Sequence, residues 1–141
     1  MKIVYSYYVL DIVHKGHLHM MKNAKALAGE DGKLIVGILT DEAVMEKKKQ
    51  PIMPFEDRIE LASSIKYVDL AVAQTTYSPI ENVRHLKPDI LCESSSHTPE
   101  AIAEAEQLMK ELKGRLVVVP YYPVASSTKI KQKIVDHSNS K

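Results

Sequence analysis

The sequence predicts an α/β protein in which helices cover both faces of a parallel sheet. Short apolar runs rich in β-branched residues alternate with longer segments whose apolar residues recur at helical spacing. The chain has 141 residues, 45% of them hydrophobic and 26% charged, which is the size and composition of one globular domain. We therefore expect a single doubly wound, Rossmann-like domain at residues 1–136, followed by a frayed polar tail at residues 137–141.

Five runs are expected to form the strands of the sheet. In chain order they are Lys2–Val9, Lys33–Leu39, Asp69–Ala73, Asp89–Cys92 and Arg115–Val119. The segments between them are long enough for the helical crossovers that parallel strands require.

Two of the intervening segments carry clear apolar stripes, which we interpret as the core faces of helices. The stripes are Leu18, Met21, Ala24 and Leu27 in the first, and Ile102, Ala105, Leu108, Met109 and Leu112 in the second. Gly29 and Gly114 stand where these helices should end. Prolines stand where three helices should begin, at Pro54, Pro79 and Pro99.

Composition and charge argue against several functional classes for this chain. The 19 basic and 18 acidic side chains leave a net charge of +1, so we expect no nucleic-acid partner. The longest stretch without a charged residue, Leu116–Thr128, contains two prolines and is too short to span a membrane. The N-terminus has no secretory signal pattern, and Cys92 is the only cysteine, so we expect a cytoplasmic protein.

In a doubly wound sheet, ligands bind beyond the carboxyl ends of the strands, near the point where the strand order reverses. The loop after the first strand contains His14 and His17 on either side of Gly16, directly before the first helix. If the helix begins at Gly16, both imidazoles and the free backbone N–H groups face one cavity, which suits a phosphate. A metal site is the alternative, but His19 should point elsewhere and no cysteine or carboxylate set completes it, so we expect no metal ligands.

These residues form part of a series of motifs that resembles the HxGH nucleotidyltransferases. The signature is His14-Lys15-Gly16-His17, preceded by Asp11. The series continues with a lysine cluster and the blocks Pro51–Arg58, Tyr67–Asp69, Lys87–Asp89 and Ser126–Ile130. The chain is most similar to the glycerol-3-phosphate cytidylyltransferase type and to the adenylyltransferase domain that makes ADP-heptose.

The resemblance implies that a nucleoside triphosphate reacts at its α-phosphorus with a phosphate oxygen of a second substrate and releases pyrophosphate. It implies catalytic roles for His14, His17, Lys47 and Lys49, and Mg²⁺ as the cofactor. The residues implied to bind the nucleotide are Tyr8, Val9, Leu10, Asp11, Arg58, Tyr77, Ser95, Ser126, Ser127 and Thr128.

Several of these residues also have a purely structural interpretation. The lysines could form a solvated surface, and Arg58 could pair with an acidic residue one turn away on its helix. One hydroxyl among Ser126, Ser127 and Thr128 is expected to cap the helix that follows. Asp11 could be a turn or cap residue, or could position the histidine loop or hold Mg²⁺ through water.

Three positions depart from the family pattern. Tyr8 and Val9 replace a glycine and a small residue, Ser94-Ser95-Ser96-His97 replaces an acidic loop after the fourth strand, and Tyr121 replaces an arginine. We expect transfer of CMP from CTP to a small phosphorylated or phosphonylated alcohol. The alternatives are adenylyl transfer from ATP to a sugar phosphate or FMN, and a nucleotide-binding module without catalysis. The resemblance also implies a homodimer.

Overall fold

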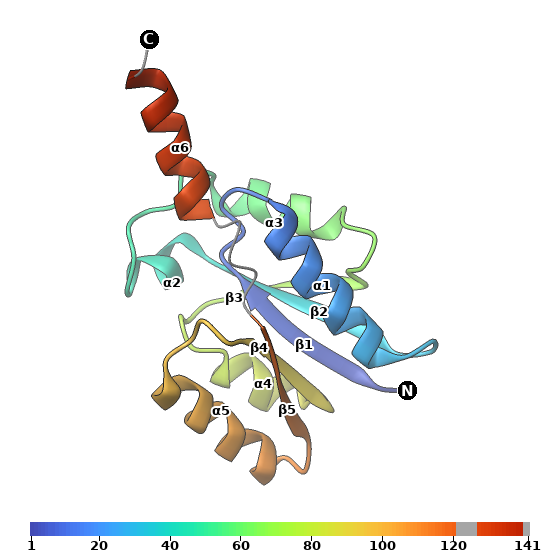
Figure 1. Cartoon of the computed structure of the whole chain (residues 1–141). Coiled ribbons are helices and arrows are strands. Elements are labelled where there is room, and N and C mark those ends of the chain that lie inside the picture. The colour runs from blue at the N-terminus through green and yellow to red at the C-terminus, as the bar shows by residue number, and fades with distance from the viewer. Residues whose placement is uncertain (121–126, 140–141) are drawn as a thin grey trace.

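The computed structural model describes residues 1–120 and 127–139 and contains a five-stranded, all-parallel sheet with strand order β3-β2-β1-β4-β5 (Figure 1). The strands are β1 (Ile3–Tyr8), β2 (Lys33–Leu39), β3 (Leu70–Gln74), β4 (Ile90–Ser94) and β5 (Arg115–Val119). The predicted fold class is confirmed, and each predicted strand overlaps an observed one. The order reverses between β1 and β4, so the loops that follow these two strands diverge there.

The helices are α1 (Lys15–Ala28), α2 (Asp41–Met45), α3 (Phe55–Ser63), α4 (Ile80–Leu86), α5 (Pro99–Glu111) and α6 (Ser127–Asn139). Pro54 and Pro79 are the N-caps of α3 and α4, and Pro99 is the first residue of α5, as predicted. Gly29 ends α1 with φ +77°, a conformation that glycine adopts without a Cβ clash.

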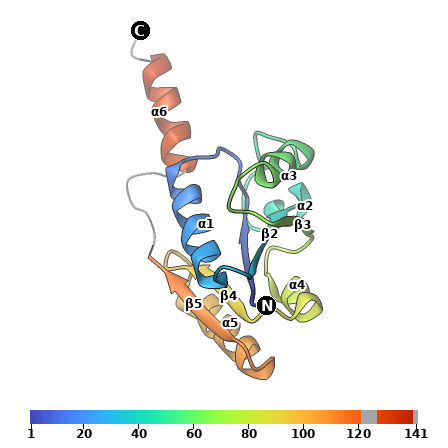
Figure 2. The ribbon, with the colours of Figure 1, turned by 90° about the vertical axis from the view of Figure 1, so that its right-hand side faces the viewer.

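Two hydrophobic clusters lie on opposite faces of the sheet. One joins Val4 and Val36 of the sheet to Met21 and Ala24 of α1 and Ala62 of α3. The other joins two sheet residues, Tyr5 and Leu91, to α4 and α5 through Val83, Ala105, Leu108 and Met109. The helices therefore form the outer layers of a three-layer α/β/α domain (Figure 2).

The first predicted helix stripe is only partly correct. Leu18 is exposed, whereas Ala28 is buried together with Met21 and Ala24. The buried positions of α1 are therefore Gly16, Met21, Ala24 and Ala28. His17, directly after Gly16 in the first turn of α1, is partly buried.

Helix α6 continues through His137 to Asn139, into the segment expected to be a polar tail. The boundary between domain and tail stays a prediction. Both views show α6 extending away from the sheet beyond its carboxyl edge (Figures 1 and 2). No helix in the described part of the chain is long and apolar enough to cross a membrane.

Candidate active site

A cavity of about 830 Å³ opens at the carboxyl edge of the sheet. Nine of the predicted site residues line it: Tyr8, Val9, Leu10, Asp11, His14, His17, Lys49, Tyr77 and Thr128. The loops after β1 and β4 and the first turn of α6 all contribute to its wall. The cavity thus lies at the strand-order reversal, where a doubly wound sheet binds its ligand.

The two histidines cap the N-terminus of α1 reciprocally. His14 is the N-cap, and its Nδ1 accepts a hydrogen bond from the Gly16 N–H at 3.0 Å. Nδ1 of His17 accepts one from the His14 N–H at 3.2 Å, and the rings stack with their centroids 3.9 Å apart. Because each Nδ1 is an acceptor, each neutral ring carries its proton on Nε2. The pair therefore has two N–H donors left for a ligand in the cavity.

The surroundings keep both rings neutral. Burial, reinforced by the neighbouring His14, lowers the pKa of His17 to about 3. Burial also lowers the pKa of His14 below its ordinary value. Near neutral pH, the histidines can therefore stabilise negative charge by donating hydrogen bonds next to the positive end of the α1 dipole, without carrying a formal charge.

Tyr8 replaces the glycine of the family pattern without blocking the cavity. It occupies an ordinary strand position, and its ring packs against the core and edge-on to His17, with centroids 6.1 Å apart. The left-handed conformation occurs two residues later, at Leu10, with φ +60°. Leu10 is fully buried, so core packing stabilises the strained backbone that leads into the histidine loop.

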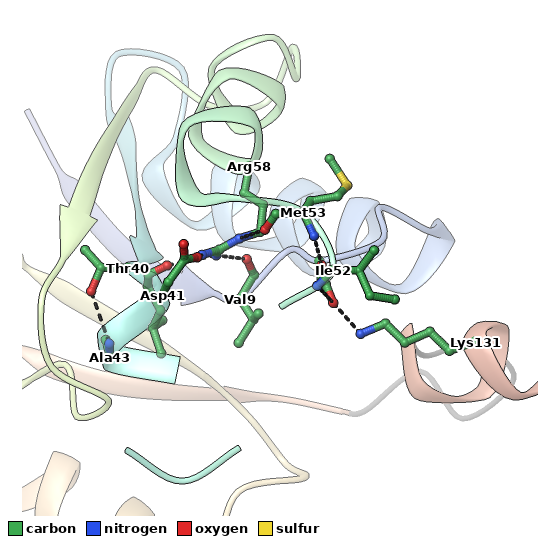
Figure 3. Close-up of polar contacts among 10 residues, drawn as sticks. Val9, Thr40, Asp41, Ala43, Ile52, Met53, Arg58 and Lys131 are labelled. Carbon is green, nitrogen blue, oxygen red and sulfur yellow. Dashed lines mark hydrogen bonds and ion pairs between the residues drawn. The ribbon is translucent and has the colours of Figure 1, made fainter. Parts of the chain in front are cut away.

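Asp11 connects three segments around the cavity. Its carboxylate accepts the Ile52 and Met53 N–H groups at 3.0 and 2.9 Å, and it pairs with the Lys131 ammonium of α6. Burial acts to raise the pKa of Asp11, but the hydrogen bonds from Lys131, Met53 and Ile52 outweigh it and lower the pKa. Asp11 therefore orders the histidine loop, the segment before α3 and the start of α6. Figure 3 shows its partners Ile52, Met53 and Lys131.

Arg58 lies elsewhere than the sequence indicated. Its side chain is fully buried, and its guanidinium donates to the carbonyls of Val9, Leu39 and Met53 at 2.6 to 3.0 Å and pairs with Asp41 at 2.7 Å (Figure 3). The expectations of a phosphate contact and of an ion pair within its own helix both need correction. In this structure Arg58 holds together the loops that form the cavity edge, because those loops present carbonyl oxygens to a buried cation.

Not all of the other predicted site residues line the cavity. Lys47 and Ser95 lie outside the described cavity lining, whereas Lys48 and Lys49 are part of it. The Lys47 ammonium instead lies 5.7 Å from the ring centroid of Tyr77. Ser126 and Tyr121 lie outside the described residues, and Ser127 is described only as the first residue of α6. Cys92 is buried in β4, and burial raises the pKa of its thiol to about 12, so the thiol is a poor nucleophile near neutral pH.

Sequence reasoning missed two features of the site. Lys131 lies one helical turn after Thr128, and this spacing was the available signal for its place in the lining. The second feature is a network in which buried Glu93 accepts hydrogen bonds from Tyr7 and contacts His97. Glu93 and His97 are four residues apart, but Tyr7 is remote in sequence, so the sheet register alone brings it to them.

The described residues do not fit a resident Mg²⁺ site. They include no group of three or more side chains able to hold a metal ion. Asp11 is the only carboxylate in the described lining, and both of its oxygens already accept hydrogen bonds. A divalent ion that enters bound to a triphosphate would be part of the substrate.

Comparisons with known proteins agree with this geometry. A family model described as Cytidylyltransferase-like matches residues 9–133. FAD synthases of Korarchaeum cryptofilum and Thermococcus kodakarensis are 34% and 36% identical, over 89% and 91% of this chain and 86% and 88% of theirs. The bifunctional protein HldE of Desulfatibacillum aliphaticivorans is 30% identical over 94% of this chain but only 27% of its own length.

Solved structures agree as well. A lipopolysaccharide core biosynthesis protein of Thermoplasma volcanium matches with a TM-score of 0.72 and 30% identity, over 86% of this chain and 96% of that one. The family match covers most of the sequence and includes both histidines, Asp11 and the lysine cluster. The chain belongs to the Cytidylyltransferase-like family and is a nucleotidyltransferase.

Proposed function

We propose that this chain is an adenylyltransferase that transfers AMP from ATP to FMN. The observation that carries the proposal is the match to FAD synthases, which covers 86 to 88% of those proteins and 89 to 91% of this chain. The match to HldE covers about a quarter of that protein and supports ATP as donor without favouring a heptose acceptor. The comparisons thus support the alternative, adenylyl transfer, better than the CMP transfer that the sequence motifs favoured.

The cavity fits the demands of this reaction. An oxygen of the FMN phosphate attacks the α-phosphorus of ATP, the bond from that phosphorus to the bridging oxygen breaks, and pyrophosphate leaves. The attacking oxygen is already ionised, so the step needs no general base. What it needs is alignment of two anions and stabilisation of the charge that develops on the phosphates.

We expect residues of this chain to align the two anions and to stabilise the charge that develops on the phosphates. The Nε2–H groups of His14 and His17 and the free N–H groups of α1 would face the α- and β-phosphates. Lys49, Lys48 and Lys131 supply positive charge from two other sides of the cavity. We expect Thr128, which lines the cavity from the first turn of α6, to bind the terminal phosphates, together with Ser126 and Ser127 as the family resemblance implies. The homodimer and the cytoplasmic location belong to the same proposal.

The test is pyrophosphate release from each of the four ribonucleoside triphosphates with FMN, glycerol 3-phosphate and a heptose phosphate as acceptors. We expect release with ATP and FMN, and FAD as the product on chromatography. Turnover with CTP and glycerol 3-phosphate but not with ATP and FMN would contradict the proposal and restore cytidylyl transfer.

A further inference from the structure

The turn that follows β4 brings polar side chains into the cavity that have no part in the phosphate end described above. The His97 N–H donates to the Ser94 carbonyl at 3.2 Å and closes the turn. The Ser94 hydroxyl oxygen accepts the Ser96 N–H at 3.2 Å and lies 2.8 Å from the Ser96 hydroxyl. Ser94, Ser96 and His97 all line the cavity. One short turn therefore presents two hydroxyls and an imidazole to the same space.

The imidazole of His97 is oriented by a residue outside the cavity lining. Glu93 is buried, at 2% exposure, and lies outside the cavity lining. The Tyr7 hydroxyl donates to both of its carboxylate oxygens, at 3.0 and 2.9 Å, and His97 Nδ1 contacts one of them. A carboxylate only accepts hydrogen bonds, so Nδ1 must carry a proton, and Nε2 is the ring atom left for a ligand.

The position of Tyr7 is in turn fixed by packing against Tyr5. Its ring stacks on Tyr5 with centroids 6.4 Å apart, and the Tyr5 hydroxyl donates to Gln74 at 2.6 Å and accepts from Asn82 at 3.0 Å. The contacts from Tyr5 through Tyr7 to the buried Glu93 thus fix the orientation of His97, the way a buried carboxylate orients an imidazole in other sites.

Building on the function proposed above, we propose that Ser94, Ser96 and His97 form a subsite for vicinal hydroxyl groups, and that Glu93 is the positioning residue that orients His97. Serine hydroxyls both donate and accept, and an oriented imidazole nitrogen adds a directional partner, so the set matches hydroxyls better than it matches phosphate. In the function proposed above, the lysines and the histidine pair bind the phosphates. Vicinal hydroxyls occur in the ribityl chain of FMN and in the ribose of ATP.

The experiment compares two matched pairs of probes by calorimetric binding and by steady-state kinetics. One pair is FMN and its analogue with an unsubstituted pentyl chain in place of ribityl. The other is ATP and 2′-deoxyATP. We expect the wild-type protein to favour the hydroxylated member of one pair by about tenfold in Kd, and His97→Leu to reduce that preference to about twofold.

The probe pair for which His97→Leu loses the preference for the hydroxylated member shows whether the subsite binds the ribityl or the ribose hydroxyls. Unchanged preferences for both pairs in His97→Leu would overturn the proposal. The matched control is His85→Leu, an exposed histidine on α4 outside the cavity, which should keep both preferences.

Glu93 needs a test that separates positioning from folding. Glu93→Gln keeps an oxygen that can accept from His97 Nδ1, so it should retain most of the preference, whereas Glu93→Ala should lose it as His97→Leu does. A structural role alone would lower the Tm without changing the ratio of the two Kd values, and that result would contradict the positioning role. If Glu93→Ala does not fold, Tyr7→Phe is measured instead and should reduce the same ratio.

The binding arms also separate this inference from the proposed function. If the wild-type protein releases no pyrophosphate from ATP and FMN, the proposed function fails, while the ATP pair still tests the subsite by calorimetry. If the wild-type protein makes FAD but His97→Leu keeps both preferences, the subsite fails and the function stands.

Discussion

The neutral state of His17 predicts a specific loss of stability in mild acid. Burial lowers the pKa of His17 from its ordinary value of 6.5 to about 3 in the folded protein. Between these values the unfolded chain binds more protons than the folded chain, so protonation favours unfolding. The stabilisation is complete above pH 6.5 and is lost progressively as the pH falls toward 3.

The magnitude follows from the two pKa values. From pH 7 to pH 5, the linkage relation gives a loss of about 2 kcal/mol of unfolding free energy for one such group. The ring is partly exposed, and solvent screening reduces this to about 1 to 2 kcal/mol. With a urea m-value of about 2 kcal/mol per M, the unfolding midpoint should fall by about 0.5 to 1 M through His17 alone.

The assay is urea unfolding of the wild-type protein and of His17→Gln at both pH values. Glutamine does not titrate, so the variant should lose less stability than the wild-type protein between pH 7 and pH 5, by about 1 to 2 kcal/mol. Comparing pH dependences removes the constant effect of the lost helix cap. The His85→Gln variant should keep the wild-type dependence. Equal pH dependence in His17→Gln and the wild-type protein would refute the reasoning about a buried, neutral pair.

Three further predictions concern the histidine pair, Arg58 and Lys131. His14→Ala and His17→Ala should each lower kcat on the order of a hundredfold while the Kd for ATP changes little, because their donors act on charge that develops during the reaction. Arg58→Met should lower the free energy of unfolding by about 3 kcal/mol or more, since it leaves three carbonyls and a carboxylate without their partner. Lys131→Met should weaken ATP binding about tenfold and reduce its salt dependence, because it removes a positive charge from the cavity.

The Arg58 and Lys131 predictions each have a matched control variant. Arg84→Met removes an exposed ion pair with Glu111 and should cost no more than about 1 kcal/mol, so an equal cost for Arg58→Met would contradict its bracing role. Lys133→Met changes an exposed lysine on α6 outside the described lining, and ATP affinity should stay near the wild-type value. If the two lysine variants bind ATP equally, Lys131 has no part in nucleotide binding.

The fold was predictable because its signals are local. Alternating apolar runs and helical stripes are read within ten or fifteen residues, and prolines and glycines mark the ends of the helices. Leu18 shows the limit of this approach, since its spacing suits the predicted stripe but the side chain is exposed, whereas Gly16 and Ala28 are buried with Met21 and Ala24. A rotation of one residue around a helix is set by packing against the sheet, which the sequence of the helix alone does not specify.

The site was predictable only where its chemistry is also local. His14 and His17 are three residues apart, so the capping turn brings them together whatever the rest of the chain does. Arg58 differs because its partners lie in three other segments, and the sequence near it offers acidic residues that it does not use. A charged side chain close to a family motif therefore indicates proximity to the site, but its contacts decide whether it binds substrate or the protein itself.

The two ends of the cavity differ in how the chain builds them, and this difference bears on specificity. The phosphate end uses backbone N–H groups, a helix dipole and two neighbouring histidines, all of which depend on a short segment whose chemistry suits any triphosphate. The β4 end depends on Tyr7, Glu93 and His97, which the parallel register of β1 and β4 brings together. Phosphates are common to CTP, ATP, FMN and the sugar phosphates, so under the subsite proposed above we expect the β4 end of the described lining to discriminate among substrates that differ in their hydroxyl groups. Substitutions there should therefore change which substrate is used before they change how fast the phosphorus is transferred.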